Sequence, residues 1–275
     1  MSDLAEQITR LWDGRDELAA VMPPAEARAV VHEAIELLDR GEARVAEVVD
    51  GEVVVHEWLK QAILLLFRLE GLSVIEAGPF EYHDKLPLKH DYASARVRVV
   101  PGGSARWGSY LAPGVILMPS YVNIGAWVGP NTMVDTWATV GSGAQIGADV
   151  HLAGGVGIGG VLEPPNATPV IVEDGAFLGS RCIVTEGVRI GAGAVLSANV
   201  SLTASVPIID VTGAEPVEHR GAVPPRAVVV PGTRPKEFPA GTYQLDCALI
   251  IGWRKESHDE RLSLNETLRE FELAV

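Results

Sequence analysis

The chain has 275 residues, of which 47% are hydrophobic but only 6% aromatic, and it contains 29 glycines and 18 prolines. This composition favours aliphatic strands joined by many small-residue turns over a helical bundle. The net charge of −14 argues against nucleic acid or an anionic membrane as the main partner.

The N-terminal region predicts a small, mostly helical unit. Leu4, Ile8 and Leu11 have helical spacing, and a second helix is expected over residues 27–38, after two prolines and before Gly41. A third is expected from about residue 57 to 69, with Gly71 behind it, and residues 53–55 predict a short strand. Because the first residues are acidic and the longest apolar run covers only residues 62–67, we expect no signal peptide and no membrane span, and a soluble cytoplasmic protein.

An aliphatic residue then recurs at every sixth position, which is the dominant pattern of the chain. The first block comprises Ile116, Val122, Val128, Val134, Val140, Ile146, Leu152 and Ile158. After a Pro-rich break near residues 160–169, the second comprises Val172, Leu178, Val184, Ile190, Leu196 and Leu202. A second insertion over residues 205–222 precedes the pair Val223 and Val229.

A period of six fits neither the 3.6-residue period of a helix nor the alternation of an ordinary strand. It is typical of hexapeptide β-helices, in which six residues form one side of a triangular coil and successive coils cover one another. Small or β-branched residues follow each aliphatic one at the fourth position, as in Ser120, Ala126 and Thr132, and allow the chain to turn. The sequence therefore predicts a mainly β protein built on a parallel β-helix.

Beyond residue 231 the pattern ends. Residues 243–252 predict a strand, and residues 263–271 a short terminal helix.

Several stretches resemble the tetrahydrodipicolinate N-succinyltransferase family. They are YLAPGVILMPSYVN (residues 110–123), TMVDTWATV (132–140), HLAGGVGIGGVLEP (151–164), HEWLKQAILLLF (56–67), RVVP (98–101) and CALIIGWR (247–254). The resemblance runs from about residue 50 to the end and includes the flanks of the repeats. It implies a left-handed coil over residues 98–235, between an N-terminal helical domain (1–97) and a short C-terminal α/β segment (236–275).

The resemblance also implies an activity. Members of the family transfer a succinyl group from succinyl-CoA, as co-substrate, to the amine of a ring-opened dicarboxylate, 2-amino-6-oxopimelate. They form homotrimers with sites between subunits. The reaction needs a base, donors for the oxyanion and cations for two carboxylates, but no tightly bound cofactor and no metal.

Two acidic residues are the catalytic candidates. Asp135 matches the aspartate of the family's VDTWATV motif, which contacts the substrate amine, although it also occupies a turn position that short polar residues favour. Many members carry a glutamate two residues after the arginine of a GARSE stretch, but this chain has Ile183 there. Glu186 is the nearest substitute, and it can equally be a solvated acid on a coil face.

Seven basic residues are the binding candidates. Arg98, Arg106 and Arg181 are expected to bind the substrate carboxylates, because a guanidinium holds a carboxylate with two hydrogen bonds. Arg98 has the strongest match to a family position, whereas Arg106 and Arg181 can instead form ordinary ion pairs. Arg234 and Lys236 are assigned to the CoA phosphates, with Arg254 and Lys255 further along the chain.

His151 and Cys182 are weighed separately. His151 lies inside the repeats and is expected to be structural, with a role as base left open. Cys182 occupies a small-residue corner and is expected to pack rather than react. The two cysteines, Cys182 and Cys247, form neither a disulfide framework nor a spaced metal motif.

Three other functions are considered. A zinc hydro-lyase of the carbonic anhydrase type shares this fold, but it needs three imidazoles and the repeats contain one. A tetrahydrodipicolinate acetyltransferase acts on the same substrate with a shorter acyl group. A scaffold protein without activity is the third alternative.

Overall fold

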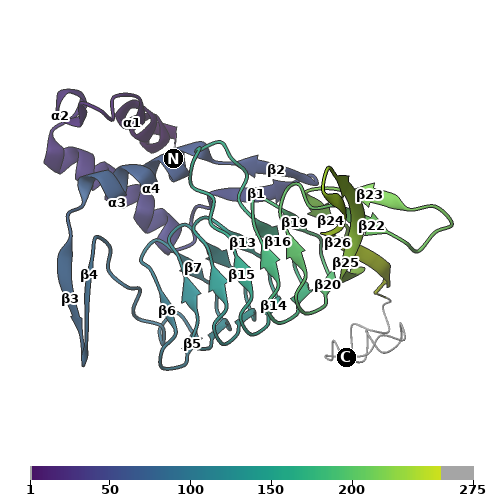
Figure 1. The fold of residues 1–275 in the computed structure, drawn as a ribbon. Helices are drawn as coiled ribbons and strands as arrows, with labels where there is room; N and C mark the ends of the chain where they lie inside the picture. The colour runs from purple at the N-terminus through teal and green to yellow at the C-terminus, as the bar shows by residue number, and fades with distance from the viewer. Residues whose placement is uncertain (1, 255–275) are drawn as a thin grey trace.

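The computed structural model describes residues 2–254 and begins with four helices (Figure 1). They are α1 (Ser2–Asp13), α2 (Leu18–Val21), α3 (Pro24–Asp39) and α4 (Glu57–Leu69). The three helices predicted from apolar spacing are confirmed as α1, α3 and α4. The single turn of α2 was not predicted, because four residues are too few to show a period.

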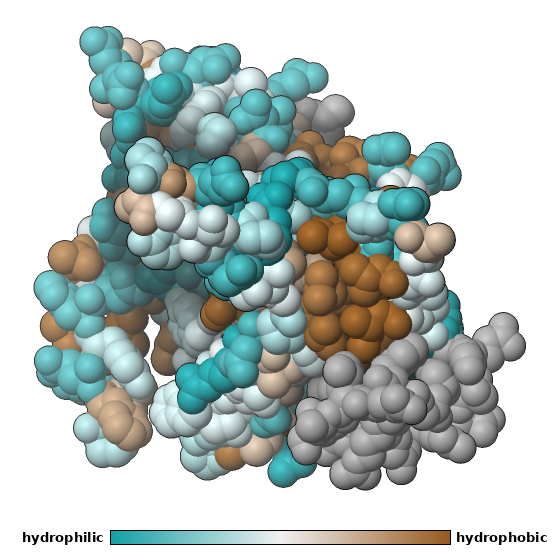
Figure 2. All heavy atoms as spheres, turned by 45° about the vertical axis from the view of Figure 1, so that its right-hand side comes forward, coloured by the Kyte–Doolittle hydropathy of each residue, from teal (hydrophilic) through white to brown (hydrophobic). Residues whose placement is uncertain are grey.

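Two β-hairpins belong to the same region. Strand β1 (Ala46–Val49) pairs with β2 (Glu52–Val55), which confirms the strand predicted at residues 53–55. The turn between them uses Asp50 and Gly51 at φ of 51° and 86°, as a two-residue hairpin loop requires. The second hairpin, β3 (Ser73–Ala77) with β4 (Phe80–Asp84), was not predicted. It stands apart from the rest of the molecule as a separate column (Figures 1 and 2).

The centre of the molecule is a triangular coil with three parallel faces, as the period of six predicts. Face 1 contains β5 (Arg98–Val99), β8 (Ile116–Leu117), β11 (Met133–Val134), β14 (His151–Leu152), β17 (Phe177–Leu178), β20 (Val195–Leu196) and the start of β25 (Ala227–Phe238). Face 2 contains β6 (Ser104–Ala105), β9 (Tyr121–Val122), β12 (Thr139–Val140), β15 (Gly157–Ile158), β18 (Ile183–Val184) and β21 (Ser201–Leu202). Face 3 contains β7 (Tyr110–Leu111), β10 (Trp127–Val128), β13 (Gln145–Ile146), β16 (Ile171–Val172), β19 (Arg189–Ile190) and β24 (Ala222–Val223).

The second residue of each two-residue strand points into the coil. Val134, Val140, Ile146 and Leu152 are completely buried and belong to one continuous apolar cluster. The first member of the predicted series is an exception. Leu117, not Ile116, is the inward residue of β8. The step from Leu117 to the next inward residue, Val122, is five positions rather than six. The period of six therefore holds from Val122 onward, and the placement of Ile116 in the core was wrong.

The N-terminal region covers face 3. The guanidinium of Arg44, which precedes β1, lies 4.3 Å from the ring centre of Trp127, and its Nε donates to Gln145 Oε1 at 3.0 Å. Ile124, from the coil, is buried in the apolar cluster of the helices. Because face 3 is covered in this way, faces 1 and 2 remain for other contacts.

The C-terminal end of the coil is closed by longer strands. The insertion at residues 205–222 forms a hairpin of β22 (Ile208–Asp210) and β23 (Val217–His219), and β26 (Gly241–Trp253) confirms the predicted strand at 243–252. Strand β25 pairs antiparallel with β26 and runs through residue 235 without a break. The helix predicted at residues 263–271 lies outside the described residues. No helix within residues 2–254 combines the length and apolar character needed to cross a bilayer.

Candidate functional site

Asp135 lies at the corner where the chain passes from face 1 to face 2. Its backbone N–H donates to Leu152 O of the next coil turn at 2.9 Å, so the corner is fixed by the repeat itself. Its Oδ1 accepts hydrogen bonds from the backbone N–H and the hydroxyl of Thr136, at 2.6 and 3.2 Å. One carboxylate oxygen therefore has the turn-stabilising role weighed from the sequence, and Oδ2 is left for another partner.

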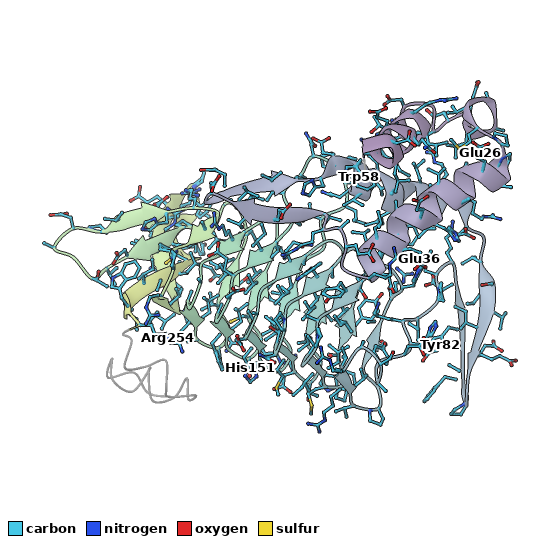
Figure 3. The ribbon with its side chains drawn as sticks, turned by 180° about the vertical axis from the view of Figure 1, so that it is seen from behind. Glu26, Glu36, Trp58, Tyr82, His151 and Arg254 are labelled. Carbon is cyan, nitrogen blue, oxygen red and sulfur yellow. The ribbon has the colours of Figure 1, made fainter. Side chains whose placement is uncertain are left out.

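The imidazole of His151, one coil turn away, lies beside Asp135 Oδ2. Met133 of β11 pairs with His151 of β14, which pairs with Phe177 of β17, so the three side chains form a column on the outside of face 1. The imidazole packs on Phe177 with ring centres 4.9 Å apart, and its Nε2 lies 3.6 Å from Asp135 Oδ2. This separation is too long for a hydrogen bond, and the buried Nε2 has no hydrogen-bond partner within residues 2–254. Figure 3 shows His151 at the edge of the coil, far from Trp58 and Glu36 of the helical domain.

Trp137 stands beside Asp135 on the same corner. Its side chain is 72% exposed and its backbone has a φ of 61°, an unusual conformation for a bulky residue. In the next two turns this place is taken by Gly155 and Arg181. A Cβ on Gly155 would lie 2.7 Å from Arg181 Cδ, so the Arg181 side chain crosses the space that the glycine leaves open. An aromatic ring and a guanidinium thus flank the Asp135 corner.

Arg98 begins face 1, in the same outward column as Met133 and His151. It is exposed, and it pairs with Ile116, which pairs with Met133. Arg98 therefore lies three turns from His151, or about 14 Å at the usual spacing of adjacent strands.

Arg106 is occupied by contacts within the chain. Its guanidinium forms an ion pair with Asp84 at the end of β4, donates to Asn123 Oδ1 at 3.3 Å, and lies 5.4 Å from the ring centre of Phe67. The ion pair lowers the pKa of the Asp84 carboxyl, against an opposing effect of burial that is the largest single influence. These contacts match the ion-pair alternative considered for this residue.

Glu186 lies on a different corner, between faces 2 and 3. Its backbone has a φ of 55°, and its Oε2 accepts a hydrogen bond from Ala204 N at 3.2 Å. A cavity of about 770 Å³ opens beside it. Leu64 and Phe67 of α4, the corner residue Ser142 and the loop residues Gly159 to Glu163 line this cavity together with Thr185 and Glu186.

Two adjacent residues, Cys182 and Ile183, lie on the coil before the Glu186 corner. Ile183, which replaces the family glutamate, is 40% exposed on face 2, and its Cδ1 would lie 2.8 Å from a Cβ on Gly157. Cys182 is completely buried, and its Sγ donates to Ser197 O at 3.0 Å. Burial raises the pKa of the Cys182 thiol to about 12, so the residue is part of the coil interior.

The basic residues assigned to the CoA phosphates lie at the far end. Arg234 and Lys236 are on β25, opposite Leu245 and Tyr243 of β26, and the Lys236 ammonium lies 5.6 Å from the ring centre of Phe238. Arg254 donates to Gly175 O at 3.2 Å, and Lys255 lies outside the described residues.

The fold thus brings some candidates together and separates others. Asp135, Arg181 and Arg98 belong to face 1 or its corner, whereas Glu186 lies at the opposite edge of face 2. Trp137 was not predicted as a site residue, and His151 was expected to be structural, with a role as base left open. The position of His151 could have been predicted from the period. One coil turn contains 18 residues, which places His151 directly above Met133 and close to Asp135.

Comparisons with known proteins add an independent line of evidence. Residues 3–69 match a family described as tetrahydrodipicolinate N-succinyltransferase N-terminal, and residues 169–204 match one described as hexapeptide repeat of succinyl-transferase. The chain is 48% identical over 275 residues to the 2,3,4,5-tetrahydropyridine-2,6-dicarboxylate N-succinyltransferase of Acinetobacter baylyi, covering 98% of this chain and 99% of the relative. Enzymes of the same name from Caulobacter vibrioides and Parvibaculum lavamentivorans are 47% and 48% identical over 282 residues; each match covers 98% of this chain and 100% and 99% of the relative.

Proposed function

The chain belongs to the tetrahydrodipicolinate N-succinyltransferase family, and we infer from this that it transfers a succinyl group from succinyl-CoA to tetrahydrodipicolinate. The acceptor reacts as the ring-opened 2-amino-6-oxopimelate, and the product belongs to the diaminopimelate and lysine pathway. The observation that carries the assignment is near-50% identity along the whole chain, flanks as well as repeats. The relatives matched do not favour the acetyltransferase, the carbonic anhydrase or a scaffold.

The reaction forms an amide and breaks a thioester. The substrate amine, after losing its ammonium proton, attacks the thioester carbonyl, and the C–N bond forms as negative charge develops on oxygen. The amine then loses its second proton as the C–S bond breaks, and the CoA thiolate leaves and is protonated. One protein group must therefore accept a proton close to the amine.

The Asp135 corner provides groups of this kind. Asp135 Oδ2 is free of the hydrogen bonds that hold Oδ1, and His151 Nε2 is 3.6 Å from it. An amine nitrogen placed against Asp135 Oδ2 can donate a hydrogen bond to this carboxylate and lose a proton to it, with the imidazole of His151 beside the carboxylate. We assign amine orientation to Asp135 and assistance in proton removal to His151.

The substrate also carries two carboxylates. Arg98 and Arg181 are the proposed ligands, because both are exposed and both belong to face 1 or its corner. Arg106 has a weaker claim, since Asp84 already neutralises it. For the CoA phosphates, Arg234 and Lys236 remain our assignment, which rests on their charge and their place on an exposed strand.

A site that uses both acids needs more than one chain. Asp135 and Glu186 flank face 2, one side of the coil, and lie in different turns. At about 3.3 Å per residue, the six residues of one coil side span up to about 20 Å, a distance that no single small substrate bridges at hydrogen-bond distance. This separation supports a homotrimer in which the Asp135 corner of one subunit faces the Glu186 corner of the next. We also propose a cytoplasmic location, where succinyl-CoA is available.

The decisive assay measures thiol release from succinyl-CoA with the cyclic dicarboxylate as acceptor, beside the same assay with acetyl-CoA. The proposal requires thiol release that depends on the dicarboxylate and a kcat/KM at least tenfold higher for the succinyl donor. Equal or higher turnover with acetyl-CoA would favour the acetyltransferase alternative, and no acceptor-dependent thiol release with either donor would contradict the assignment. Sedimentation at several protein concentrations tests the trimer separately.

A further inference from the structure

Lys60 is a charged side chain with no exposure to solvent. It lies in the first turn of α4 and is 0% exposed. Its Nζ donates to two backbone carbonyls, Ala167 O at 2.6 Å and Pro164 O at 3.3 Å, more than 100 residues further along the chain. Both carbonyls belong to the loop that interrupts the coil between β15 and β16, which we call the excursion loop (residues 159–170).

The excursion loop and α4 form opposite walls of the cavity beside Glu186. Lys60, Leu64 and Phe67 have the spacing that places residues on one helix face. Leu64 and Phe67 line the cavity, and so do the loop residues from Gly159 to Glu163. Lys60 therefore connects the two walls at their base, behind the lining residues, and does not itself line the cavity.

Stability alone gives no reason for a lysine at this position. A buried ammonium costs free energy unless it is fully compensated, and an apolar side chain of similar volume is often as stable. Burial lowers the pKa of Lys60 to about 8, and the nearby Glu57 only partly offsets this. What a methionine cannot provide is a donor for two carbonyls that both belong to a loop with little regular structure.

We propose that Lys60 is a positioning residue, whose ammonium holds the carbonyls of Pro164 and Ala167 and so fixes the excursion loop as a wall of the Glu186 cavity. Lys60 touches no substrate in this arrangement. The loop has a second fixed point in the bond from Val161 N to Ser142 O, at 3.1 Å, and a third where Leu162 packs on the helices. The link to catalysis rests on the proposed function, because it assumes that the Glu186 cavity serves acyl transfer.

The test compares Lys60→Met and Lys60→Gln with Lys85→Met in the full-length protein. Lys85 is a matched control because its Nζ also donates to a backbone carbonyl of the helical domain, Phe67 O, and within residues 2–254 it forms no hydrogen bond or ion pair with the excursion loop. Three quantities are measured: amide hydrogen exchange of residues 160–170, the midpoint of thermal unfolding, and kcat and KM with succinyl-CoA. Lys60→Gln keeps one donor and ensures a folded comparison.

For Lys60→Met we expect exchange in the loop to be at least tenfold faster and kcat/KM to be at least tenfold lower. We expect a thermal midpoint within a few degrees of the wild type, intermediate values for Lys60→Gln, and no change in loop exchange for Lys85→Met. Wild-type loop exchange in Lys60→Met would overturn the proposal, and so would equal effects of Lys60→Met and Lys85→Met. Faster loop exchange with unchanged kcat/KM would overturn the link to catalysis. An inactive wild type would instead contradict the proposed function, while the exchange data still decide whether Lys60 holds the loop.

Discussion

The Nε2 atom of His151 lies 3.6 Å from the Oδ2 atom of Asp135, although 16 residues separate them along the chain. The contact exists because one turn of the coil returns the backbone to the same corner. It gives the Asp135 carboxylate, which also stabilises a turn, an imidazole neighbour that the linear sequence does not place beside it.

The first prediction concerns Asp135. Asp135→Asn keeps the oxygen that accepts from Thr136 but removes the negative charge near the amine. We expect kcat to fall by about 10² to 10⁴, the usual contribution of a positioned acid or base, with an unchanged thermal midpoint. Thiol release measures the rate. Asp149→Asn is the control, because Asp149 also lies at a coil corner and only accepts a hydrogen bond from Asn131, at 3.1 Å. Equal losses in both variants would point to a structural effect.

The second prediction concerns His151. His151→Phe keeps an aromatic ring against Phe177 and removes both ring nitrogens. We expect a folded protein with kcat reduced at least tenfold, because the proton acceptor beside Asp135 is lost. Steady-state kinetics and the thermal midpoint, measured on the same preparation, separate the two effects. Wild-type kcat in this variant would return His151 to the structural role first expected from the sequence.

The third prediction concerns thiol reactivity. Burial raises the pKa of Cys182 to about 12 and also raises that of Cys247. The thiolate is the reactive form, so almost no Cys182 thiolate is present at pH 8, and the thiolate of Cys247 is less populated than that of an exposed cysteine. We expect the folded enzyme to keep full activity in excess iodoacetamide at pH 8, and both thiols to react once the protein is unfolded in guanidinium. Rapid inactivation together with alkylation of Cys182 would contradict a purely packing role.

The fourth prediction concerns stability and pH. The folded pKa of Lys60, about 8, lies below the value of 10.5 expected for an unfolded lysine. Between these two values the unfolded chain binds more protons, so this group makes the free energy of unfolding rise as the pH increases from 8 to 10.5. Comparison with Lys60→Met cancels the other titrating groups. Denaturant unfolding at several pH values should show the wild type gaining stability relative to the variant across this range, and a constant difference would be the contrary result.

The fifth prediction concerns the coil itself. Leu202 and Ser201 are neighbours on β21, but Leu202 is buried in the core and Ser201 is exposed. Leu202→Ala leaves a cavity in a closely packed interior and should lower the free energy of unfolding by about 2–5 kcal/mol. Ser201→Ala should change it by less than about 0.5 kcal/mol. Equilibrium unfolding measures both. Similar values for the two variants would mean that β21 does not point Leu202 inward.

The sequence by itself was sufficient to predict the triangular coil. A strict period of six is a local property, since each hexapeptide places one aliphatic residue inward regardless of what happens elsewhere. The three long helices were equally readable, because their apolar faces repeat at 3.6 residues. Asp50-Gly51 between β1 and β2 was a readable hairpin signal. Gly78-Pro79 between β3 and β4 is also a turn dipeptide, but no hairpin was predicted from it. The inward position of Leu117 in place of Ile116 depends on a corner that is one residue shorter.

The composition of the site was decided by the tertiary structure. The family resemblance identified Asp135, Arg98 and Glu186 as candidates, but only the stacking of coil turns determines which side chains share a corner. It placed His151 against Asp135 and Arg181 over Gly155, and it put Glu186 across face 2. The tertiary structure also placed Asp84 of β4 beside Arg106, an ion pair that the linear sequence does not show. The physical reason is that the repeat determines whether each side chain points into the coil or away from it. Which side chains touch one another depends on which coil turns lie next to each other.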